Sequence, residues 1–323
     1  MIFRHVGKVM LSLILAALLS GCFGEEKQAI RIGINAWPGY EFLFLAREKG
    51  FFEKHDVKIE LVEFTSLGDV RLAFERKQVD GMASTLIEVI ETRGRTDQKA
   101  EVFLIADYSE GGDVIVGLKA GKSIADLKGK RIGSELASLN IFVLTRALEK
   151  AGLSITDIEI VPMDQSVMLE ALKTEEVSAV VTYPPTLNDI LALEQAHALF
   201  TSKEIPGEIV DVLSLNREIL AERQDDVRHL IDAWNDAVSY AQTNPEEAGE
   251  IMGRRYNISS AEFMESLEGL KVVNSENQAQ MLAKGGPLSN TIAKVIDVMI
   301  RNKQIDEKID PDTLINNSAL SSR

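Results

Sequence analysis

Residues 30–53, which read IRIGINAWPGYEFLFLAREKGFFE, decide the fold of this chain. They predict a short apolar strand over 30–35 and then an amphipathic helix over 40–49 that stops at Gly50. Glycine readily adopts the left-handed conformation that ends a helix. A buried strand that leads directly into a helix of this length is the opening unit of an α/β fold.

The same alternation continues beyond this unit. Apolar runs predict strands over 57–64, 80–84 and 101–107, and an amphipathic stretch predicts a helix over 67–77. Short strands that alternate with helices favour one open, mainly parallel sheet for this half of the chain.

The pattern then restarts. Arg131-Ile132-Gly133 repeats Arg31-Ile32-Gly33 one hundred positions later, and a strand–helix–strand–helix–strand order follows, over 131–133, 138–150, 158–162, 167–174 and 177–182. A chance match explains three residues more easily than a repeated order of elements. The repeat predicts an α/β fold of two similar lobes, each with a β-α-β-α-β core. A single continuous sheet is the alternative, and it explains the restart poorly.

The rest of the chain is mostly helical and is expected to pack on the first lobe, with helices over 217–243, 245–255, 259–267 and 287–302. The expected divisions are a signal peptide over 1–21, a tether over 22–29, a first lobe made of 30–110 and 211–323, and a second lobe over 111–210.

Two segments are expected to cross between the lobes. The first lies near 107–113, where adjacent glycines permit backbone rotation, and the second is a strand-like run over 209–216. Two crossings predict a hinge, for which the candidate residues are Asp107, Gly111, Gly112 and Asp211.

The N-terminus has the features of a targeting segment. A basic start is followed by an apolar run over 10–19, which is shorter than the roughly 20 residues that a membrane-spanning helix needs. The run ends in Leu19-Ser20-Gly21-Cys22, which matches the bacterial lipobox and predicts lipidation of Cys22. The alternatives are a cleaved secretory peptide that holds a cysteine by chance, or a core helix. We expect a lipoprotein anchored in the cell envelope that faces the periplasm or the exterior.

Composition excludes several classes of protein. The 323 residues carry a formal net charge of −15, which disfavours a nucleic-acid partner because phosphates are bound through Lys and Arg. Cys22 is the only cysteine, so disulfides, cysteine-rich zinc sites and iron–sulfur clusters are excluded. We expect neither a metal nor a cofactor.

Several segments resemble one family. They are Asn35-Ala36-Trp37-Pro38-Gly39-Tyr40-Glu41, Glu48-Lys49-Gly50-Phe51-Phe52-Glu53, Val79-Asp80-Gly81-Met82-Ala83, residues 123–130, residues 146–153 and residues 208–213. Together they are similar to NMT1/THI5-like substrate-binding lipoproteins of ABC transporters, the nitrate, sulfonate, taurine and thiamine-precursor type, across about residues 30–300.

The resemblance implies a two-lobed periplasmic-binding-protein fold, type II-like. It also implies a monomeric solute-binding protein that captures a small metabolite by lobe closure and delivers it to an ABC permease and ATPase. The family often carries Trp or Phe and then Glu-Pro after the strand that ends near Thr182. Tyr183-Pro184-Pro185 stands there instead, so one glutamate of the family is missing.

Ligands of open α/β sheets bind beyond the carboxyl ends of the strands, which identifies the candidate loops. Their aromatic rings, hydroxyls and amides are typical of small-molecule clefts. The candidate ligand-binding residues are Trp37, Tyr40, Thr65, Ser66, Ser84, Thr85, Tyr108, Glu110, Ser138, Asn140 and Tyr183. Trp37 and Tyr183 are expected outside the core, whereas Thr65, Ser66 and Ser138 are equally typical helix N-caps.

The charge of these loops favours one class of ligand. They hold no Arg or Lys. Their acidic residues are Glu41, Asp107, Glu110, Asp113, Asp164 and Asp211. Such loops suit a small neutral or cationic nitrogen compound, for example of pyrimidine type. Two alternatives stay open: an anion of the nitrate, sulfonate or taurine type bound at helix N-termini, and a ligand-sensing receptor subunit for a membrane kinase or cyclase.

Catalysis is not expected. Yeast relatives of the family make the thiamine pyrimidine with a cysteine-rich motif and a sacrificial histidine. The chain has four histidines, His5, His55, His197 and His229. None of them follows a predicted strand of the cleft.

Overall fold

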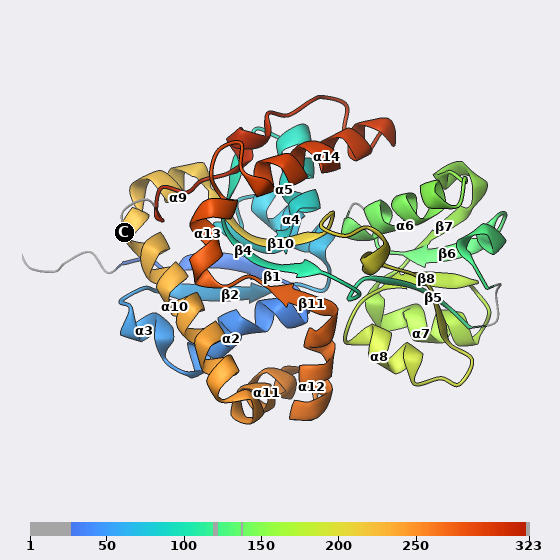
Figure 1. Ribbon diagram of the computed structural model, residues 1–323, viewed down its shortest axis with the longest axis horizontal. Coiled ribbons are helices and arrows are strands. Elements are labelled where there is room, and N and C mark those ends of the chain that lie inside the picture. The colour runs from blue at the N-terminus through green and yellow to red at the C-terminus, as the bar shows by residue number, and fades with distance from the viewer. Residues whose placement is uncertain (1–26, 119–121, 137, 321–323) are drawn as a thin grey trace, which may run out of the picture.

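The computed structural model describes residues 27–118, 122–136 and 138–320, and it has two lobes (Figure 1). The predicted lipidation site Cys22, the predicted signal peptide and most of the predicted tether lie outside these residues. Each lobe is built on its own sheet, one of six strands and one of five. The two Arg-Ile-Gly segments lie in different sheets, which confirms the α/β two-lobed fold predicted from the repeat.

The sheet of the first lobe has the strand order β11-β4-β10-β3-β1-β2. Its strands are β1 (Ile30–Ile34), β2 (Ile59–Glu63), β3 (Gly81–Thr85), β4 (Ala100–Ser109), β10 (Val210–Asn216) and β11 (Leu270–Val272). β1 pairs in parallel with β2 and β3, whereas β10 and β11 pair antiparallel with β4. The sheet is therefore mixed, and the expectation of a mainly parallel sheet holds only for its first three strands.

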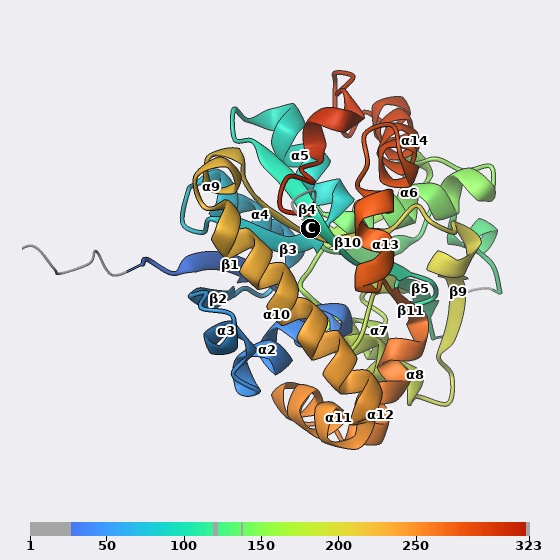
Figure 2. The ribbon, with the colours of Figure 1, turned by 60° about the vertical axis from the view of Figure 1, so that its left-hand side comes forward.

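Helices cover both faces of this sheet. Those of the first half are α2 (Glu41–Glu48), α3 (Phe51–Lys54), α4 (Leu67–Glu75) and α5 (Leu86–Arg95). Those of the C-terminal block are α9 (Arg217–Glu222), α10 (Gln224–Thr243), α11 (Pro245–Gly253), α12 (Ser260–Ser266), α13 (Ser275–Met281) and α14 (Pro287–Arg301). α10 lies along α2 and α3, as expected of a block that packs on the first lobe (Figure 2).

The second lobe has the strand order β7-β6-β8-β5-β9. Its strands are β5 (Val114–Gly117), β6 (Arg131–Ser134), β7 (Glu159–Pro162), β8 (Ala179–Thr182) and β9 (His197–Thr201), and its helices are α6 (Leu139–Lys150), α7 (Gln165–Lys173) and α8 (Thr186–Leu191). β6 pairs in parallel with β7 and β8, in the same arrangement as β1 with β2 and β3. This correspondence is the structural form of the sequence repeat.

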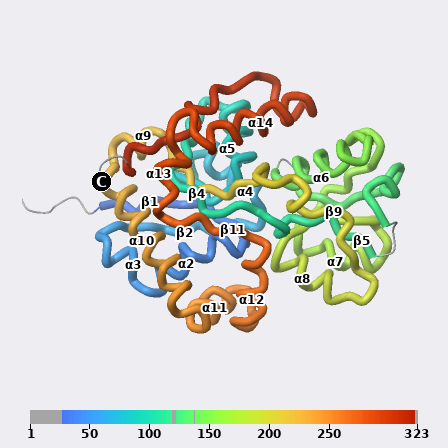
Figure 3. The backbone as a smooth tube through the Cα atoms, viewed as in Figure 1, coloured from blue at the N-terminus to red at the C-terminus, as the bar shows by residue number. Residues whose placement is uncertain are grey.

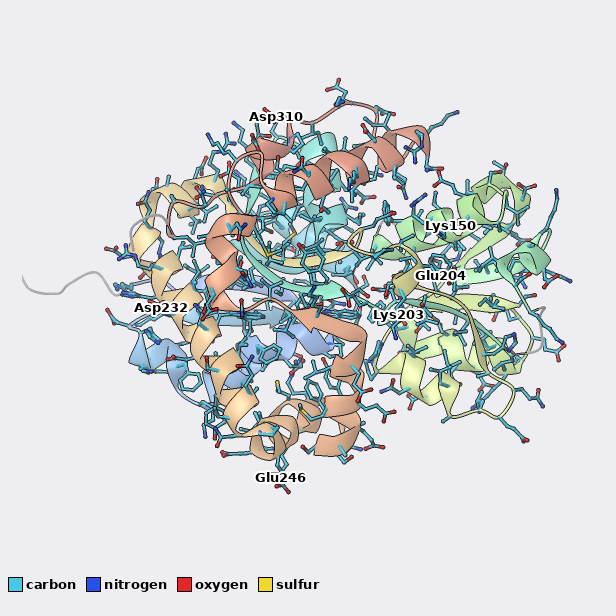
Figure 4. All side chains as sticks on the ribbon, viewed as in Figure 1. Lys150, Lys203, Glu204, Asp232, Glu246 and Asp310 are labelled. Atoms are coloured by element: carbon cyan, nitrogen blue, oxygen red, sulfur yellow. The ribbon has the colours of Figure 1, made fainter. Side chains whose placement is uncertain are left out.

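The chain crosses between the lobes from β4 to β5 and again from β9 to β10 (Figure 3). The two crossings are hydrogen-bonded to each other, because Ser202 Oγ accepts from the Gly111 N–H at 2.6 Å and lies 2.8 Å from Ser109 Oγ. Gly111 has a φ of 126°, which a residue with a side chain rarely adopts. Lys203 and Glu204 lie beside the second crossing, at the junction of the lobes (Figure 4).

Candidate ligand-binding site between the lobes

A small pocket lies where the two lobes meet. Its volume is about 10 Å³, which is about the space of one water molecule. Residues of both lobes line it: Asn35, Trp37, Tyr40, Leu67, Thr85, Asp113, Leu139, Tyr183 and Asp211. None of these lining residues is Arg, Lys or His. The pocket lies beyond the carboxyl ends of β1, β3 and β8, where an open α/β sheet places its ligand.

Two aromatic rings from opposite lobes line this pocket and contact each other. The rings of Trp37 and Tyr183 meet edge to face, with their centroids 6.0 Å apart. The Tyr183 hydroxyl accepts a hydrogen bond from Asn35 Nδ2 at 3.3 Å and donates one to Glu135 Oε2 at 3.2 Å. Asn35 and Trp37 come from the first lobe and Tyr183 from the second, so these contacts exist only when the lobes are closed.

A pair of carboxyl groups forms the hinge side of the pocket. Asp107 on β4 and Asp211 on β10 are directly opposed in the sheet and are both buried. Trp37 Nε1 donates to Asp107 Oδ2 at 3.4 Å, and the Tyr40 hydroxyl donates to Asp211 Oδ1 at 2.5 Å. A Cβ at Gly39 would overlap the Asp107 carboxyl group, so glycine is required for this close approach.

The surroundings of the two opposed carboxyl groups favour their protonated forms. Burial raises the pKa of Asp107 to about 8. Burial together with the nearby Asp107 charge raises the pKa of Asp211 well above its ordinary value. Since two adjacent carboxylates in an apolar setting cannot both ionise easily, the pair carries one negative charge at most near neutral pH.

Three residues that line the pocket each carry a buried oxygen atom without a hydrogen-bond partner. Besides Asp211 Oδ2 on the hinge side, these atoms are Asp113 Oδ2 in the first crossing and Asn35 Oδ1 directly after β1. All three side chains are at least 97% buried. Burial raises the pKa of Asp113 to about 7. The pocket therefore presents three unpaired oxygen atoms from different segments of the chain.

Glu88 joins helices of opposite lobes by its carboxylate. Its Oε2 accepts from the backbone N–H of Thr85 at 3.0 Å and from the Thr85 hydroxyl at 2.6 Å, which closes a capping box on α5. Its Oε1 accepts from the Leu139 N–H at 2.9 Å, at the start of α6 in the other lobe. Burial raises the pKa of Glu88 to about 7.

A wider groove of about 900 Å³ also runs between the lobes. Its walls are the start of α4 on one side and the loops after β6 and β7 on the other, including Ser66, Arg71, Glu135, Leu136 and Asp164. Glu135 lines the groove and also accepts from Tyr183, so it lies between the groove and the pocket. Arg71 is buried and forms ion pairs with Glu75 and Glu91.

The structure brings some of the predicted ligand-binding residues together. The residues that line the pocket are Trp37, Tyr40, Thr85 and Tyr183. Ser84 and Ser138 are buried, and each is next in the chain to a lining residue, Thr85 and Leu139 respectively. Trp37 and Tyr183 are only 4% and 3% exposed and belong to one apolar cluster that extends from the first lobe into the second. The expectation that these two rings lie outside the core is therefore wrong for the closed form.

Other predicted residues lie elsewhere. Ser66 lines the outer groove and caps α4 by accepting from the Asp69 N–H, and the exposed Thr65 donates to the Asp69 carboxylate. Asn140 Nδ2 donates to the Val181 carbonyl and so fixes α6 on β8. Ser138 occupies the N-cap position of α6 without making a side-chain capping bond, and the N–H of the next residue, Leu139, donates to Glu88.

The remaining candidates belong to the region of the first crossing. Tyr108 is half-buried on β4 opposite Lys271 of β11, and the exposed Glu110 is held through its N–H by the Gly269 carbonyl. Neither lines the pocket or the groove. Of the hinge candidates, Gly111 and Gly112 lie in the first crossing, and Asp107 and Asp211 lie on the strands that lead into the two crossings.

Sequence reasoning missed the roles of Asn35, Glu88, Asp113 and Glu135. The Thr85-x-x-Glu88 spacing is the signal of a capping box, but nothing in the sequence shows that the same carboxylate reaches the other lobe. Asn35 ends the strand predicted over 30–35, and Asp113 is one of the acidic loop residues, but nothing in the sequence shows that their oxygen atoms are buried without a partner. The described residues hold no cluster of His, Cys, Asp or Glu arranged for a metal ion.

Comparisons with known proteins agree with this architecture. The family model described as NMT1/THI5 like matches residues 37–248, about two thirds of the chain. A protein of Brucella abortus (strain 2308), which bears the name "Putative binding protein", is 24% identical over 292 residues, covering 87% of this chain and 88% of the relative. Within the described residues, no helix is long and apolar enough to cross a bilayer.

Solved structures share the fold. The alkanesulfonate-binding protein SsuA from Xanthomonas axonopodis pv. citri, bound to MOPS, superposes with a TM-score of 0.75 at 17% identity, covering 91% of this chain and 99% of its own. The desulfurization enzyme DSZB superposes with a TM-score of 0.65 at 15% identity, covering 90% and 98%. Since the same architecture is found in a binding protein and in an enzyme, the site rather than the fold has to carry the function.

Proposed function

Because this chain belongs to the NMT1/THI5-like family, we propose that it is an extracytoplasmic solute-binding protein that delivers a small metabolite to an ABC importer. The observation that carries the proposal is the pocket at the junction, whose walls come from both lobes. A ligand held there makes contacts with the two lobes at once, so it stabilises the closed form more than the open form.

The present contacts describe the closed state. Asn35 and Trp37 meet Tyr183 across the junction, and Glu88 meets the start of α6. With about 10 Å³ between the walls, a metabolite enters only if the lobes separate first. Turning a mostly open population into a mostly closed one takes about 5.5 kcal/mol of preference for the closed state, which ligand contacts to both lobes would supply.

The lining of the pocket supports a small neutral or cationic nitrogen compound as the ligand, for example of pyrimidine type. Aromatic rings stand opposite one another, and the acidic groups Asp113 and Asp211 face the same space. The Xanthomonas protein binds a sulfonate, whereas an anion in this pocket would meet unpaired acceptors and no side-chain cation. We therefore favour a nitrogen compound over a nitrate-, sulfonate- or taurine-type anion.

The proposed cellular setting follows from the N-terminal sequence. The lipobox around Cys22 supports a lipid anchor in the cell envelope, and membership of the family supports a monomer that works with a permease and ATPase. A sensing role for a kinase or cyclase uses the same closed form, but the Brucella relative bears the name of a binding protein, which favours transport without catalysis.

Native mass spectrometry of the gently purified protein tests this proposal. We expect a co-purified small molecule that dissociates on activation, and a rise in melting temperature when the same compound is added back. A protein that carries no small molecule, and whose melting temperature responds to no compound in a broad screen of amines, pyrimidines and sulfonates, would refute a binding function.

A further inference from the structure

We infer that the pocket between the lobes holds a protonated amine of the ligand, received by Asp113 and the Asp107–Asp211 pair and flanked by the rings of Trp37 and Tyr183. The inference rests on the proposed binding function and narrows its ligand from nitrogen compounds in general to cations. It is carried by buried acceptors that have no partner and by the absence of side-chain cations from the lining.

Buried acceptors without a hydrogen-bond donor favour a group that can only donate. Asp113 Oδ2 and Asn35 Oδ1 are both buried, both line the pocket and both lack a hydrogen-bond donor. A buried acceptor without a donor costs free energy, which is why most buried polar groups are paired. An ammonium group carries three N–H donors and has no lone pair, so it satisfies such acceptors without creating a new unpaired one.

The acidic residues around the pocket also favour a cation. Asp113 and Asp211 line the pocket directly, and Asp107 is directly opposite Asp211 on the neighbouring strand. The nearest elements do carry arginines, but these are already paired: Arg71 with Glu75 and Glu91, and Arg255 with Glu41 and Glu63. A cationic ligand would therefore meet acidic groups that no side-chain cation of the pocket is paired with, and it would favour their ionised form.

The helix N-termini at the junction give independent support. An anionic ligand is commonly bound by the free N–H groups where a helix begins. At this junction the carboxylate of Glu88 already accepts from the N–H of Thr85, the N-cap residue of α5, and from the N–H of Leu139, the first residue of α6. The protein has thus placed its own anion where a sulfonate or nitrate would bind, which leaves the acidic side of the pocket for the ligand.

The aromatic walls suit the same group. Trp37 and Tyr183 approach the pocket from opposite lobes, and a cation near an aromatic face gains about 0.5–2 kcal/mol. Closure would bring both rings to the ligand together, so the attraction contributes to the closed state and not to the open one.

Binding of a cation here would release protons. The titratable groups that face the site are Asp107 and Tyr40 from the first lobe, Asp113 from the first crossing, Asp211 from β10, Glu88 from α5, and Glu135 and Tyr183 from the second lobe. Burial raises the pKa of each of them. At neutral pH a carboxyl of this group holds a proton that an ammonium ion would displace to solvent, while the amine keeps its own proton.

Isothermal titration calorimetry of the full-length protein with three probes of the same ring and different charge tests the inference. The probes are benzylamine, benzyl alcohol and benzenesulfonate. We expect benzylamine to bind at least tenfold more tightly than the other two, because a hydrogen bond to a charged group contributes at least about that factor. Its affinity should fall as the pH is lowered from 8 to 5.5, and proton release should appear as a dependence of the heat on the ionisation enthalpy of the buffer.

Two matched variants distinguish a contact inside the pocket from a general effect of the charge of the protein. Asp113→Asn should weaken benzylamine by about tenfold or more and flatten the pH dependence. Glu110→Gln removes the same charge three residues away, at an exposed position outside the pocket, and should change the affinity by less than about twofold. Circular dichroism melting of both variants checks that the fold is retained.

The outcomes distinguish this inference from the function on which it rests. Benzyl alcohol or benzenesulfonate binding as tightly as the amine, or Asp113→Asn without effect, would overturn the inference and leave the binding function standing. The inference is also overturned if no amine of a wider panel binds while a neutral or anionic metabolite does. If no compound of any charge binds, the proposed function itself fails.

Discussion

Single buried carboxyl groups dominate the chemistry of the lobe junction. Burial raises the pKa of Asp107 to about 8 and the pKa values of Glu88, Asp113 and Glu135 to about 7. Ordinary carboxyl groups of an unfolded chain titrate near 4. Between about pH 4 and pH 8 the folded, ligand-free protein therefore binds more protons than the unfolded chain.

This difference predicts how stability depends on pH. Because the folded pKa values are raised, the stabilisation is present below the unfolded pKa and is lost as the pH rises through 7 to 8. We expect the melting temperature of the ligand-free protein to fall from pH 5.5 to pH 8.5. Asp107→Asn should make this fall smaller, since an amide cannot ionise. A melting temperature that rises over the same interval would contradict the burial of these groups.

The two facing rings make a second prediction for single residues. Trp37→Ala removes one wall of the pocket and should weaken ligand binding by at least about tenfold, as truncation of a buried Trp anchor typically does. Tyr183→Phe keeps the ring and removes the hydroxyl that joins Asn35 and Glu135, so it should weaken binding less. Titration calorimetry with the co-purified metabolite measures both. Equal affinities of the two variants and the unaltered protein would remove these rings from the site.

For single residues, the sequence predicts the position in the fold better than it predicts the contacts of the side chain. Trp37, Tyr40, Thr85 and Tyr183 were found because each follows a strand of an α/β core, and that rule depends on local order alone. The hydrogen bond between Glu88 and the start of α6 depends on how the lobes meet, which no local pattern contains.

At the scale of elements, the junction is organised by the starts of α5 and α6. One carboxylate, that of Glu88, accepts from the N–H of the α5 N-cap residue Thr85 and from the first N–H of α6, and it ties the lobes together in the closed form. Each helix N-terminus carries a partial positive charge that favours an anion. Glu88 supplies that anion from within the protein.

Removal of this carboxylate should create sensitivity to anions. In Glu88→Ala the N–H groups of Thr85 and Leu139 lose their acceptor, and we expect benzenesulfonate to raise the melting temperature of this variant but not of the unaltered protein. Glu262→Ala removes a capping-box carboxylate from α12, away from the junction, and is the matched control. The absence of any anion response in Glu88→Ala, or the same response in the control, would contradict this assignment.

The strands and helices of the repeat were predicted to within a few residues, including the four-residue strands β6, β7 and β8, whereas β5, β9 and β11 were not predicted. The helix expected over 217–243 is two helices separated at Arg223, because the chain turns there between α9 and α10. β9 and β11 were missed, since strands of five and three residues at the sheet edges carry too little apolar pattern. β11 nevertheless matters, because the Gly269 carbonyl just before it accepts from the N–H groups of Glu110 and Gly112 in the first crossing.

For the whole molecule, the repeat in the sequence predicted two lobes but not how tightly they close. The Arg-Ile-Gly strands start two separate sheets, and the chain passes between them twice, as expected from the restart of the pattern. How tightly the lobes close depends on the packing of surfaces far apart in sequence. This packing determines the size of the pocket, the groove, and the contact of Asn302 on the first lobe with Glu149 on α6.

Attachment to the envelope is a separate prediction at this scale. Cys22→Ser removes the only thiol that could carry a lipid, so we expect the protein to move from the membrane fraction to the soluble fraction and to keep its ligand affinity. Cell fractionation and titration calorimetry measure the two properties. A Cys22→Ser protein that stays in the membrane fraction would show that the lipobox is not its anchor.

Closure of the lobes around a ligand is the claim on which the whole account depends, and the distance between spin labels across the groove tests it most directly. Arg76 on the first lobe and Glu170 on the second are exposed, and the absence of other cysteines allows both to be labelled as cysteines in a Cys22→Ser background. We expect a broad distribution of long distances without ligand and a narrow, shorter distance once the co-purified metabolite is bound. An unchanged distribution at saturating metabolite would contradict the account.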